Sequence, residues 1–277
     1  MTSEQPLPHW SRRPFYSGSD LVGDLKGPEV VLFVDCFNRY FEPDNLRAAV
    51  DVLVSAGRRV RFVERARENV RPLCCGKTFL SVGLVEEARH EASRLVKAAS
   101  RWVERDVPII GLEPSCVFTL REELPELNID GAGVAANTFL VEEYLMKEHQ
   151  AGRLVLDFKG GNESRILVHG HCHQKAAGAF APTIDALQLI PGTKVKAIES
   201  TCCGMAGSFG YQADTQKVGQ DIGELDLFPA IRESSEDTLL VADGTSCRHQ
   251  VAAMTERNAR HAIVVIRDAL SKEEGLL

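Results

Sequence analysis

Eight cysteines fall into two sets of four that follow the same order along the chain. Each set has one cysteine at the end of an apolar run, then the tripeptide Cys-Cys-Gly, then a cysteine after another apolar run. The first set reads VVLFVDCF, RPLCCGKTF and VPIIGLEPSCVFTL, and the second reads RILVHGHCH, ESTCCGMAG and DTLLVADGTSCRHQ. The gaps within the sets are similar, and no cysteine falls outside the scheme. This repeat predicts two copies of one structural unit.

The composition is that of a globular protein with a core. Of 277 residues, 44% are hydrophobic and 26% are charged, which suits one large domain or two smaller ones. The net charge is −7 without a basic stripe, so a nucleic-acid partner has no electrostatic support. No apolar run reaches the roughly 18 residues of a membrane span, and the N-terminus lacks the apolar core of a secretory signal. We expect a cytoplasmic protein with at most peripheral contact at the inner face of the membrane.

Hydrophobic periodicity predicts an α/β fold. Short apolar runs rich in β-branched residues favour buried parallel strands, expected at 30–34, 59–63, 107–112, 166–169, 194–198, 238–241 and 262–265. Amphipathic patterns predict helices at 45–57, 84–103, 138–148, 181–189, 217–232 and 252–260. Their alternation indicates parallel sheets with helices on both faces. We expect a tail or linker at 1–28 and two tandem, pseudo-repeated α/β units at 29–160 and 161–277.

The cysteines follow predicted strands at their carboxyl ends. In open α/β sheets, ligands bind at that edge. Three loops in each unit are therefore expected to bring four thiols together there, although the thiols are far apart in the sequence.

Four thiols in one pocket indicate a metal centre. Adjacent cysteines form disulfides only with strain, and without an export signal clustered thiols more often bind metal or do redox chemistry. Thiolates bind zinc and iron–sulfur clusters. Adjacent cysteines suit a cluster better than a single ion, because a cluster offers separate iron atoms. Zinc stays open as the alternative.

Glycines and histidines accompany the cysteines. Gly76 and Gly204 follow the cysteine pairs, where the missing Cβ permits a tight turn against a cofactor; the alternative is an ordinary turn into a helix. Four histidines lie near the second set, at His169, His171, His173 and His249. His171 and His173 are candidate proton carriers or catalytic residues, since they flank a cysteine.

For other polar residues near the cysteines, both a functional and a purely structural role are possible. For His169 and His249 the alternative is a hydrogen bond to a backbone carbonyl. Lys175 and Arg248 are candidates to offset cluster charge, or are simply solvated. No P-loop, dinucleotide fingerprint, Ser/His/Asp arrangement or H-E-x-x-H motif occurs, so this chain is not expected to bind nucleotide or flavin.

The paired Cys…Cys-Cys-Gly…Cys pattern resembles the cysteine-rich CCG domain pair. That pair occurs in a subunit of heterodisulfide reductase, the glycolate oxidase iron–sulfur subunit, the small subunit of anaerobic glycerol-3-phosphate dehydrogenase and lactate-utilisation proteins. FVDCFNRYFEP, RPLCCGKTFLSVGL, HGHCHQKA, CCGMAGSFGY and ADGTSCRHQ look closest to the C-terminal iron–sulfur part of FAD-linked 2-hydroxyacid oxidases. The resemblance covers about residues 29–270.

The resemblance implies the cofactor and its ligands. One 4Fe-4S-type cluster would be held by Cys36, Cys74, Cys75 and Cys116. The other would be held by Cys172, Cys202, Cys203 and Cys247. It also implies a flavoprotein partner that carries the FAD and oxidises glycolate or D-lactate, and a ferredoxin-type protein or quinone-linked acceptor. The chain would be an oxidoreductase subunit that passes electrons between them and is not catalytic alone.

The chain departs from the heterodisulfide-type pattern, which ends in C-x-x-C. Glu113 and Gly244 stand where that pattern has a fifth cysteine, so four ligands per site fit better. The ferredoxin-like segments and flavin domain of longer relatives are missing, which suggests a detached module. A heterodisulfide or thiol reductase and a zinc-stabilised assembly module remain competing functions.

Overall fold

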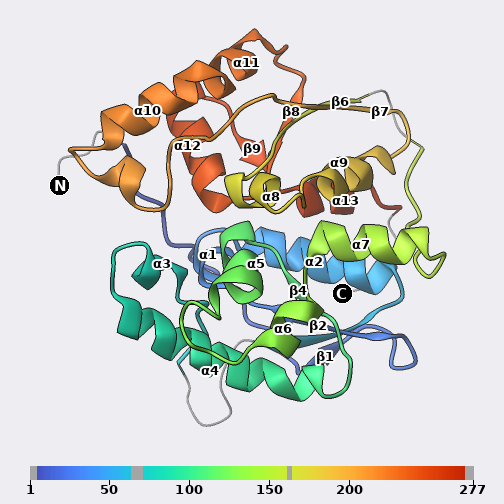
Figure 1. The fold of residues 1–277 in the computed structure, drawn as a ribbon. Coiled ribbons are helices and arrows are strands. Elements are labelled where there is room, and N and C mark those ends of the chain that lie inside the picture. The colour runs from blue at the N-terminus through green and yellow to red at the C-terminus, as the bar shows by residue number, and fades with distance from the viewer. Residues whose placement is uncertain (1–4, 64–70, 161–163, 272–277) are drawn as a thin grey trace.

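A computed structural model describes residues 5–63, 71–160 and 164–271, which form two sheets with helices below, between and above them (Figure 1). The first sheet has the order β1-β3-β2-β4-β5. Its strands are β1 (Leu21–Val22), β2 (Glu29–Phe33), β3 (Arg59–Val63), β4 (Ile109–Gly111) and β5 (Thr138–Leu140). All neighbours are parallel except β1, which runs antiparallel to β3. The sheet is therefore mixed, not purely parallel as predicted.

The second sheet has the order β7-β6-β8-β9, and all its neighbours are parallel. Its strands are β6 (Ser164–His169), β7 (Thr193–Ala197), β8 (Leu239–Ala242) and β9 (Ala259–Arg260). In each sheet the strand before the first cysteine lies between the strands before the Cys-Cys-Gly turn and the last cysteine. Parallel neighbours bring the carboxyl ends of these strands to one edge.

Helices α1 to α7 belong to the first sheet. They are α1 (Cys36–Tyr40), α2 (Pro43–Ser55), α3 (Lys77–Leu80), α4 (Val85–Val103), α5 (Pro114–Phe118), α6 (Ala132–Asn137) and α7 (Val141–Gln150), with a π-helical turn at Thr119–Glu123. The second sheet is accompanied by α8 (Cys172–Ala176), α9 (Ala181–Gln188), α10 (Gln216–Leu225), α11 (Leu227–Glu233), α12 (Thr245–Thr255) and α13 (Ala262–Ala269), with a 3-10 turn at Phe209–Tyr211.

The largest apolar core lies between the two sheets. There α2 packs on α13 and α7 packs on α9 (Figure 1). One continuous cluster joins Val30 and Leu53 of the first unit to Val168 and Ile266 of the second. Separate clusters lie under α4 on the first sheet and under α11 and α12 on the second. The two units share a core, so burying this apolar surface holds them together.

Several expected elements need correction. The segment 138–148 begins as strand β5 and continues as helix α7. The run 262–265 is part of the buried helix α13, because an apolar run without periodicity does not separate a strand from a buried helix. The expected helix 217–232 is two helices, and the one placed at 252–260 is α12, which begins and ends earlier.

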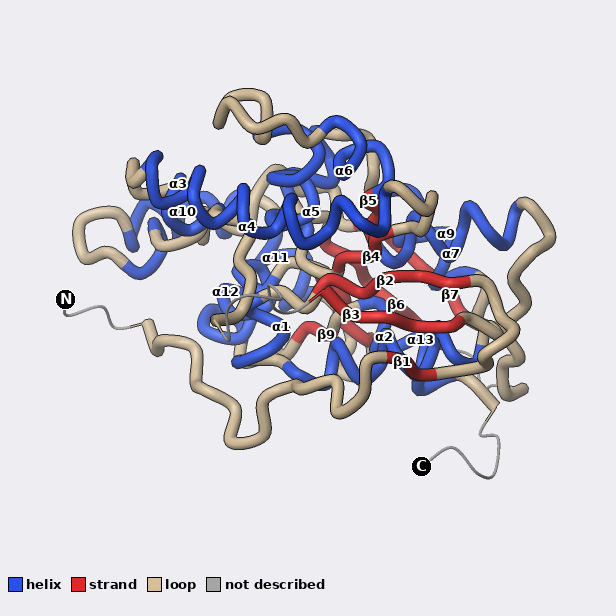
Figure 2. Tube along the Cα trace, turned by 90° about the horizontal axis from the view of Figure 1, so that it is seen from below, coloured by secondary structure: helices blue, strands red, loops and turns tan. Residues whose placement is uncertain are grey.

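The N-terminal segment is not a plain tail or linker. Figure 2 shows it as a long loop that runs along one side of the molecule before β1. β1 pairs with β3, Phe15 is buried, and the Gln5 side chain donates a hydrogen bond to Gln250 Oε1 at 2.6 Å. Residues 5–28 are thus part of the fold; the predicted boundary at 160/161 adjoins residues that lie outside the described ranges.

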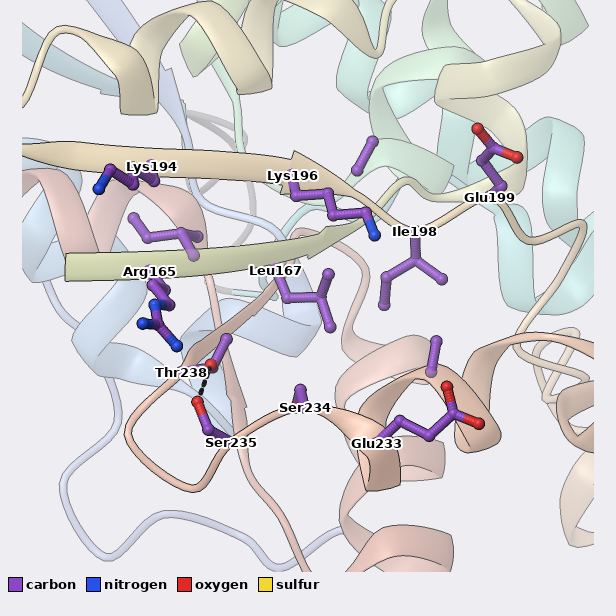
Figure 3. A pocket seen from close by; sticks show the side chains of 13 residues that line it. Arg165, Leu167, Lys194, Lys196, Ile198, Glu199, Glu233, Ser234, Ser235 and Thr238 are labelled. Carbon is purple, nitrogen blue, oxygen red and sulfur yellow. Dashed lines mark hydrogen bonds between the residues drawn. The ribbon is translucent and has the colours of Figure 1, made fainter.

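Strand β7 is an edge strand of the second sheet, and it borders a pocket of about 690 Å³. Arg165, Lys194 and Lys196 bring positive charge to its lining, beside Leu167 and Ile198 (Figure 3). Charged side chains on an edge strand discourage pairing with another chain. Within the described ranges, no helix has the length and apolar character to cross a membrane.

Candidate metal centres

Four thiols of the first unit meet in one pocket. The thiol of Cys74 forms hydrogen bonds with those of Cys36 and Cys75. Cys75 Sγ lies 3.0 Å from Cys116 Sγ. Cys75 and Cys116 are buried, while Cys36 and Cys74 are half-buried, and all are free thiols. The expected convergence of these distant residues is therefore present in the structure.

The other four thiols meet in a second pocket. The thiol of Cys202 forms hydrogen bonds with those of Cys172 and Cys203. The thiol of Cys203 also forms a hydrogen bond with that of Cys247. Again the outer two thiols, Cys172 and Cys202, are half-buried and the inner two are buried. The structure gathers each predicted quartet in the order in which the sequence presents it.

Helix starts position four of the thiols. Cys36 and Cys172 are the first residues of α1 and α8, directly after the capping residues Asp35 and His171. Cys116 and Cys247 are the third residues of α5 and α12. The N-terminal turn of a helix favours a thiolate, because its free N–H groups carry partial positive charge.

Each Cys-Cys-Gly turn uses its glycine in the same way. Gly76 and Gly204 have φ of +90° and +84°, a conformation that residues with a Cβ rarely adopt. Their N–H groups donate to the sulfur of Cys74 at 3.4 Å and of Cys202 at 3.3 Å. A Cβ at Gly204 would lie 1.8 Å from Gly219 O. Both glycines make the predicted tight turn, and Gly76 is also the N-cap of α3, so the alternative of a turn into a helix describes it as well.

The thiols of each quartet differ in acidity. Hydrogen bonds from Cys36 and Cys75 lower the pKa of Cys74 to about 3, despite partial burial. In the second unit, hydrogen bonds from Cys172 and Cys203 lower the pKa of Cys202 to about 2. These hydrogen bonds therefore favour the thiolate form of one half-buried cysteine in each pocket.

The two quartets differ at their last thiol. The hydrogen bond from Cys75 lowers the pKa of Cys116, but burial and the charges of Asp35 and Glu113 outweigh it and raise this pKa to about 12. For Cys247, the hydrogen bond from Cys203, supported by His169 and His171, lowers the pKa well below its usual value despite burial. The first centre lies among carboxyl groups and the second among imidazoles.

A polar network fixes the start of α8. The side chain of Gln174 accepts from His171 N at 3.0 Å and donates to Asp243 Oδ2 at 3.0 Å. Thr183 donates to the same Asp243 oxygen at 2.9 Å. This network positions Cys172 and was missed from the sequence, because Gln174 and Asp243 are 69 positions apart.

Direct contacts join the two centres across the unit boundary. Glu113 Oε2 accepts from Thr245 N at 2.9 Å. Helix α5 packs on α8 (Figure 1), and the rings of Phe118 and His173 have centroids 6.4 Å apart. Glu42 accepts from Thr245 Oγ1 at 2.6 Å and from Arg248 Nε at 2.7 Å. The loops that carry the two last cysteines are therefore held against each other.

Arg248 is not a solvated surface cation. It is buried, and its guanidinium also donates to the carbonyls of Ala242 and Asp243. Burial alone would raise the pKa of Glu42, but the charge and hydrogen bonds of Arg248 lower it to about 2. Glu42 was not identified from the sequence, because its partner lies 206 positions away.

The histidine expectations need partial correction. His169 Nδ1 lies 2.9 Å from Ser200 Oγ and His249 Nδ1 lies 3.3 Å from Tyr211 OH, so both meet hydroxyls rather than backbone carbonyls. The other nitrogen of His169 is buried without a hydrogen-bond partner in the described part of the chain. Lys175 Nζ donates to the carbonyls of Ser200 and Thr201 and so holds the loop before Cys202.

The candidate catalytic residues lie beside Cys172. His171 is buried, and its Nδ1 accepts from His173 N at 3.2 Å. The two rings have centroids 5.1 Å apart. His173 also interacts electrostatically with Lys77 and Glu123 of the first unit. It thus lies between the units.

A second buried group of titratable residues lies away from the thiols. It consists of Glu142, Asp243 and His261. His261 Nδ1 is 3.6 Å from Glu142 Oε1 and 3.5 Å from Asp243 Oδ1. Burial, followed by the charge of Asp243, raises the pKa of Glu142 well above its usual value.

The donor set fits an iron–sulfur cluster. Each pocket offers four sulfur atoms on three separate segments, with one backbone N–H already directed at sulfur. Thiolate ligands and N–H···S contacts are what such clusters use.

No family model matches the chain, but curated proteins do. The chain is 29% identical over 245 residues to a subunit of the anaerobic glycerol-3-phosphate dehydrogenase of Escherichia coli K12, covering 88% of this chain and 59% of that protein. It is 30% identical over 241 residues to the D-2-hydroxyglutarate dehydrogenase of Pseudomonas putida, covering 86% of this chain and 22% of that protein.

A third relative is matched over most of its own length. Lactate utilization protein A of Geobacillus kaustophilus is 25% identical over 227 residues, which cover 78% of this chain and 87% of that protein. The chain therefore spans only part of the two dehydrogenase relatives. This similarity to a dehydrogenase subunit and to a dehydrogenase is consistent with the predicted class of oxidoreductase subunit.

Proposed function

We propose that this chain is the iron–sulfur electron-transfer subunit, or module, of a flavin-linked 2-hydroxyacid oxidoreductase of the glycolate or D-lactate type. The observation that carries the proposal is the convergence of eight distant cysteines into two four-thiol pockets. Relatives named for D-2-hydroxyglutarate and lactate support the 2-hydroxyacid substrate class. A further relative is named for glycerol 3-phosphate, an alcohol without a carboxyl group.

Each pocket would hold one 4Fe-4S-type cluster, which accepts and passes on single electrons when bound. The ligands of the first would be Cys36, Cys74, Cys75 and Cys116. The ligands of the second would be Cys172, Cys202, Cys203 and Cys247. Helix starts orient the first and last cysteine of each set, and the buried inner thiols would keep water from a bound metal.

We also infer that the two units are copies of one CCG fold. Equivalent strand order, equivalent helix positions of the cysteines and the same glycine N–H···S contact support this inference. The flavin would be carried by a partner or by another part of a longer protein. A ferredoxin-type protein or a quinone-linked acceptor would take the electrons, with peripheral contact at the membrane.

The proposal is tested by metal analysis of protein prepared without oxygen. We expect about four irons and four sulfides per site, a brown colour and an EPR signal after reduction. The variants Cys75→Ser and Cys203→Ser should each lose the signal of one centre and keep that of the other.

Zinc analysis of the same samples separates the alternatives. Colourless protein with stoichiometric zinc and no sulfide would reject the electron-transfer proposal in favour of a zinc-stabilised assembly module. Zinc in one site and iron in the other would reject the two-cluster form. Mixing the loaded protein with a reduced 2-hydroxyacid flavoprotein should reduce its clusters, and absence of reduction would contradict the partner assignment.

A further inference from the structure

The two centres differ at one equivalent position. Phe33 ends β2 and His169 ends β6, and each stands three residues before the first cysteine of its quartet. Both side chains are buried, with exposures of 1% and 3%. The sequences of the two units thus place a hydrocarbon ring at one centre and an imidazole at the other.

These two rings have different neighbours. Phe33 belongs to the apolar cluster that contains Cys75 and Cys116. A ring nitrogen of His169 lies within 4.8 Å of the sulfur atoms of Cys203 and Cys247. The second centre therefore has a polar group where the first has none.

Of the two ring nitrogens, Nε2 is the one left to donate to these sulfurs. Nδ1 of His169 is engaged with the Ser200 hydroxyl at 2.9 Å. Nε2 is buried and has no hydrogen-bond partner among the described residues. A buried polar nitrogen without a partner is costly. Metal-bound thiolates are strong acceptors, so a proton on Nε2 would remove that cost.

Resting on the proposed function, we propose that His169 Nε2–H donates a hydrogen bond to the metal-bound sulfur of Cys247 or Cys203 and thereby gives the second centre the more positive reduction potential. In this arrangement Ser200 is the positioning residue, because a hydroxyl that donates to Nδ1 leaves the ring proton on Nε2. Hydrogen bonds to cluster sulfurs stabilise the reduced, more negative state. An electron delivered to the protein then rests on the second centre, which is reduced while the first stays oxidised.

The surrounding charges act in the same direction. The carboxyl groups of Asp35 and Glu113 disfavour the thiolate form of Cys116, whereas the imidazoles of His169 and His171 favour that of Cys247. Carboxyl groups disfavour added negative charge, and imidazole N–H groups favour it. Several residues thus contribute to the difference in reduction potential between the centres. Among them, His169 has a ring nitrogen within 4.8 Å of sulfur.

The test is an EPR-monitored redox titration of the cluster-loaded full chain. The wild type should show two reduction waves, and Cys203→Ser should remove the more positive one. His169→Phe, which installs the ring of the first centre, should shift that wave to more negative potential and leave the other wave in place. Ser200→Ala should shift it in the same direction by less.

Controls separate a specific effect from loss of folding. His90→Phe, which replaces an exposed histidine on α4, should leave both waves unchanged. Iron content should stay at the wild-type level in the Ser200→Ala variant, so a shift there does not depend on His169→Phe folding well.

The outcomes distinguish this inference from the function beneath it. Protein without iron would overturn the proposed function. Two clusters whose potentials do not respond to His169→Phe or Ser200→Ala would overturn only the role of His169. A strong nitrogen hyperfine coupling that disappears in His169→Phe would also overturn it, because it would identify a direct metal ligand.

Discussion

Glu113 Oε2 accepts a hydrogen bond from Thr245 N at 2.9 Å, although 132 positions separate the two residues. The other oxygen of Glu113 accepts from Ser115 N and Ser115 Oγ at the start of α5. One buried carboxyl group therefore caps the helix that carries Cys116 and holds the start of the helix that carries Cys247.

Removing this carboxyl group should destabilise both loops. Glu113→Ala leaves buried donors without a partner, so we expect the free energy of unfolding to fall by about 2 kcal/mol. Glu113→Gln should recover part of the loss, because its carbonyl can still accept from Thr245 N. Urea midpoints under anaerobic conditions measure both. Glu122→Ala, at an exposed position, is the matched control and should change stability by less than about 0.5 kcal/mol; equal midpoints for the Glu113 and Glu122 variants would contradict the bridging role.

The turn at Gly204 should not tolerate a side chain. Gly204→Ala combines a φ of +84° with a Cβ placed 1.8 Å from Gly219 O, so the turn must move and Cys202 and Cys203 with it. We expect loss of the iron bound by the second centre and retention of that of the first. Gly178→Ala is the control: its φ is +68° with no atom within 4 Å, so it carries only the conformational cost of about 1–2 kcal/mol. Full iron content in Gly204→Ala would show that the close approach to Gly219 is unimportant.

Glu142 makes stability depend on pH. Because the pKa of this buried carboxyl is raised above its usual 4.5, the folded protein binds the proton more tightly than the unfolded chain does. The free energy of unfolding should therefore fall as pH rises above about 4.5, by about 1.4 kcal/mol for each pKa unit between the two states. Glu142→Gln has no proton to release, so it should unfold at a higher temperature than the wild type at pH 8.

The difference between Glu142→Gln and the wild type should shrink as the pH is lowered toward 5. Thermal unfolding of both proteins at several pH values measures it, with Glu126→Gln at an exposed position as control. A wild type that is more stable than Glu142→Gln at pH 8 would mean that the ionised carboxylate is held by a bound cation or water.

The lysines of β7 should keep the edge of the second sheet from pairing. Lys194 and Lys196 are exposed on this terminal strand (Figure 3). Replacing both by threonine removes the charges that oppose edge-to-edge association, so sedimentation velocity should detect dimers or larger species. The same two charges removed from helices, as Lys97→Thr with Lys217→Thr, should leave the sedimentation coefficient unchanged. Identical behaviour of both double variants would mean that net charge, not strand pairing, governs association.

Local patterns predicted much of the fold. Strand β3 was expected at 59–63 and is found there, and the long helix expected at 84–103 is α4, Val85–Val103. Both follow from hydrophobic periodicity. The run at 262–265 was mistaken for a strand because burial on all sides removes the periodicity that marks a helix. His261, whose Nδ1 accepts from Ile263 N, caps that helix.

The sequence by itself determined the two cysteine quartets and their place at strand ends, because parallel strands bring loops to one edge whatever the intervening segments are. It also determined the turns at Gly76 and Gly204, because a tight turn that leaves no space for a Cβ atom requires glycine. Only the tertiary structure decided that Glu113 meets Thr245, that Glu42 meets Arg248 and that His169 faces sulfur. These contacts depend on how the two units pack, and packing joins residues whose separation leaves no local pattern to read.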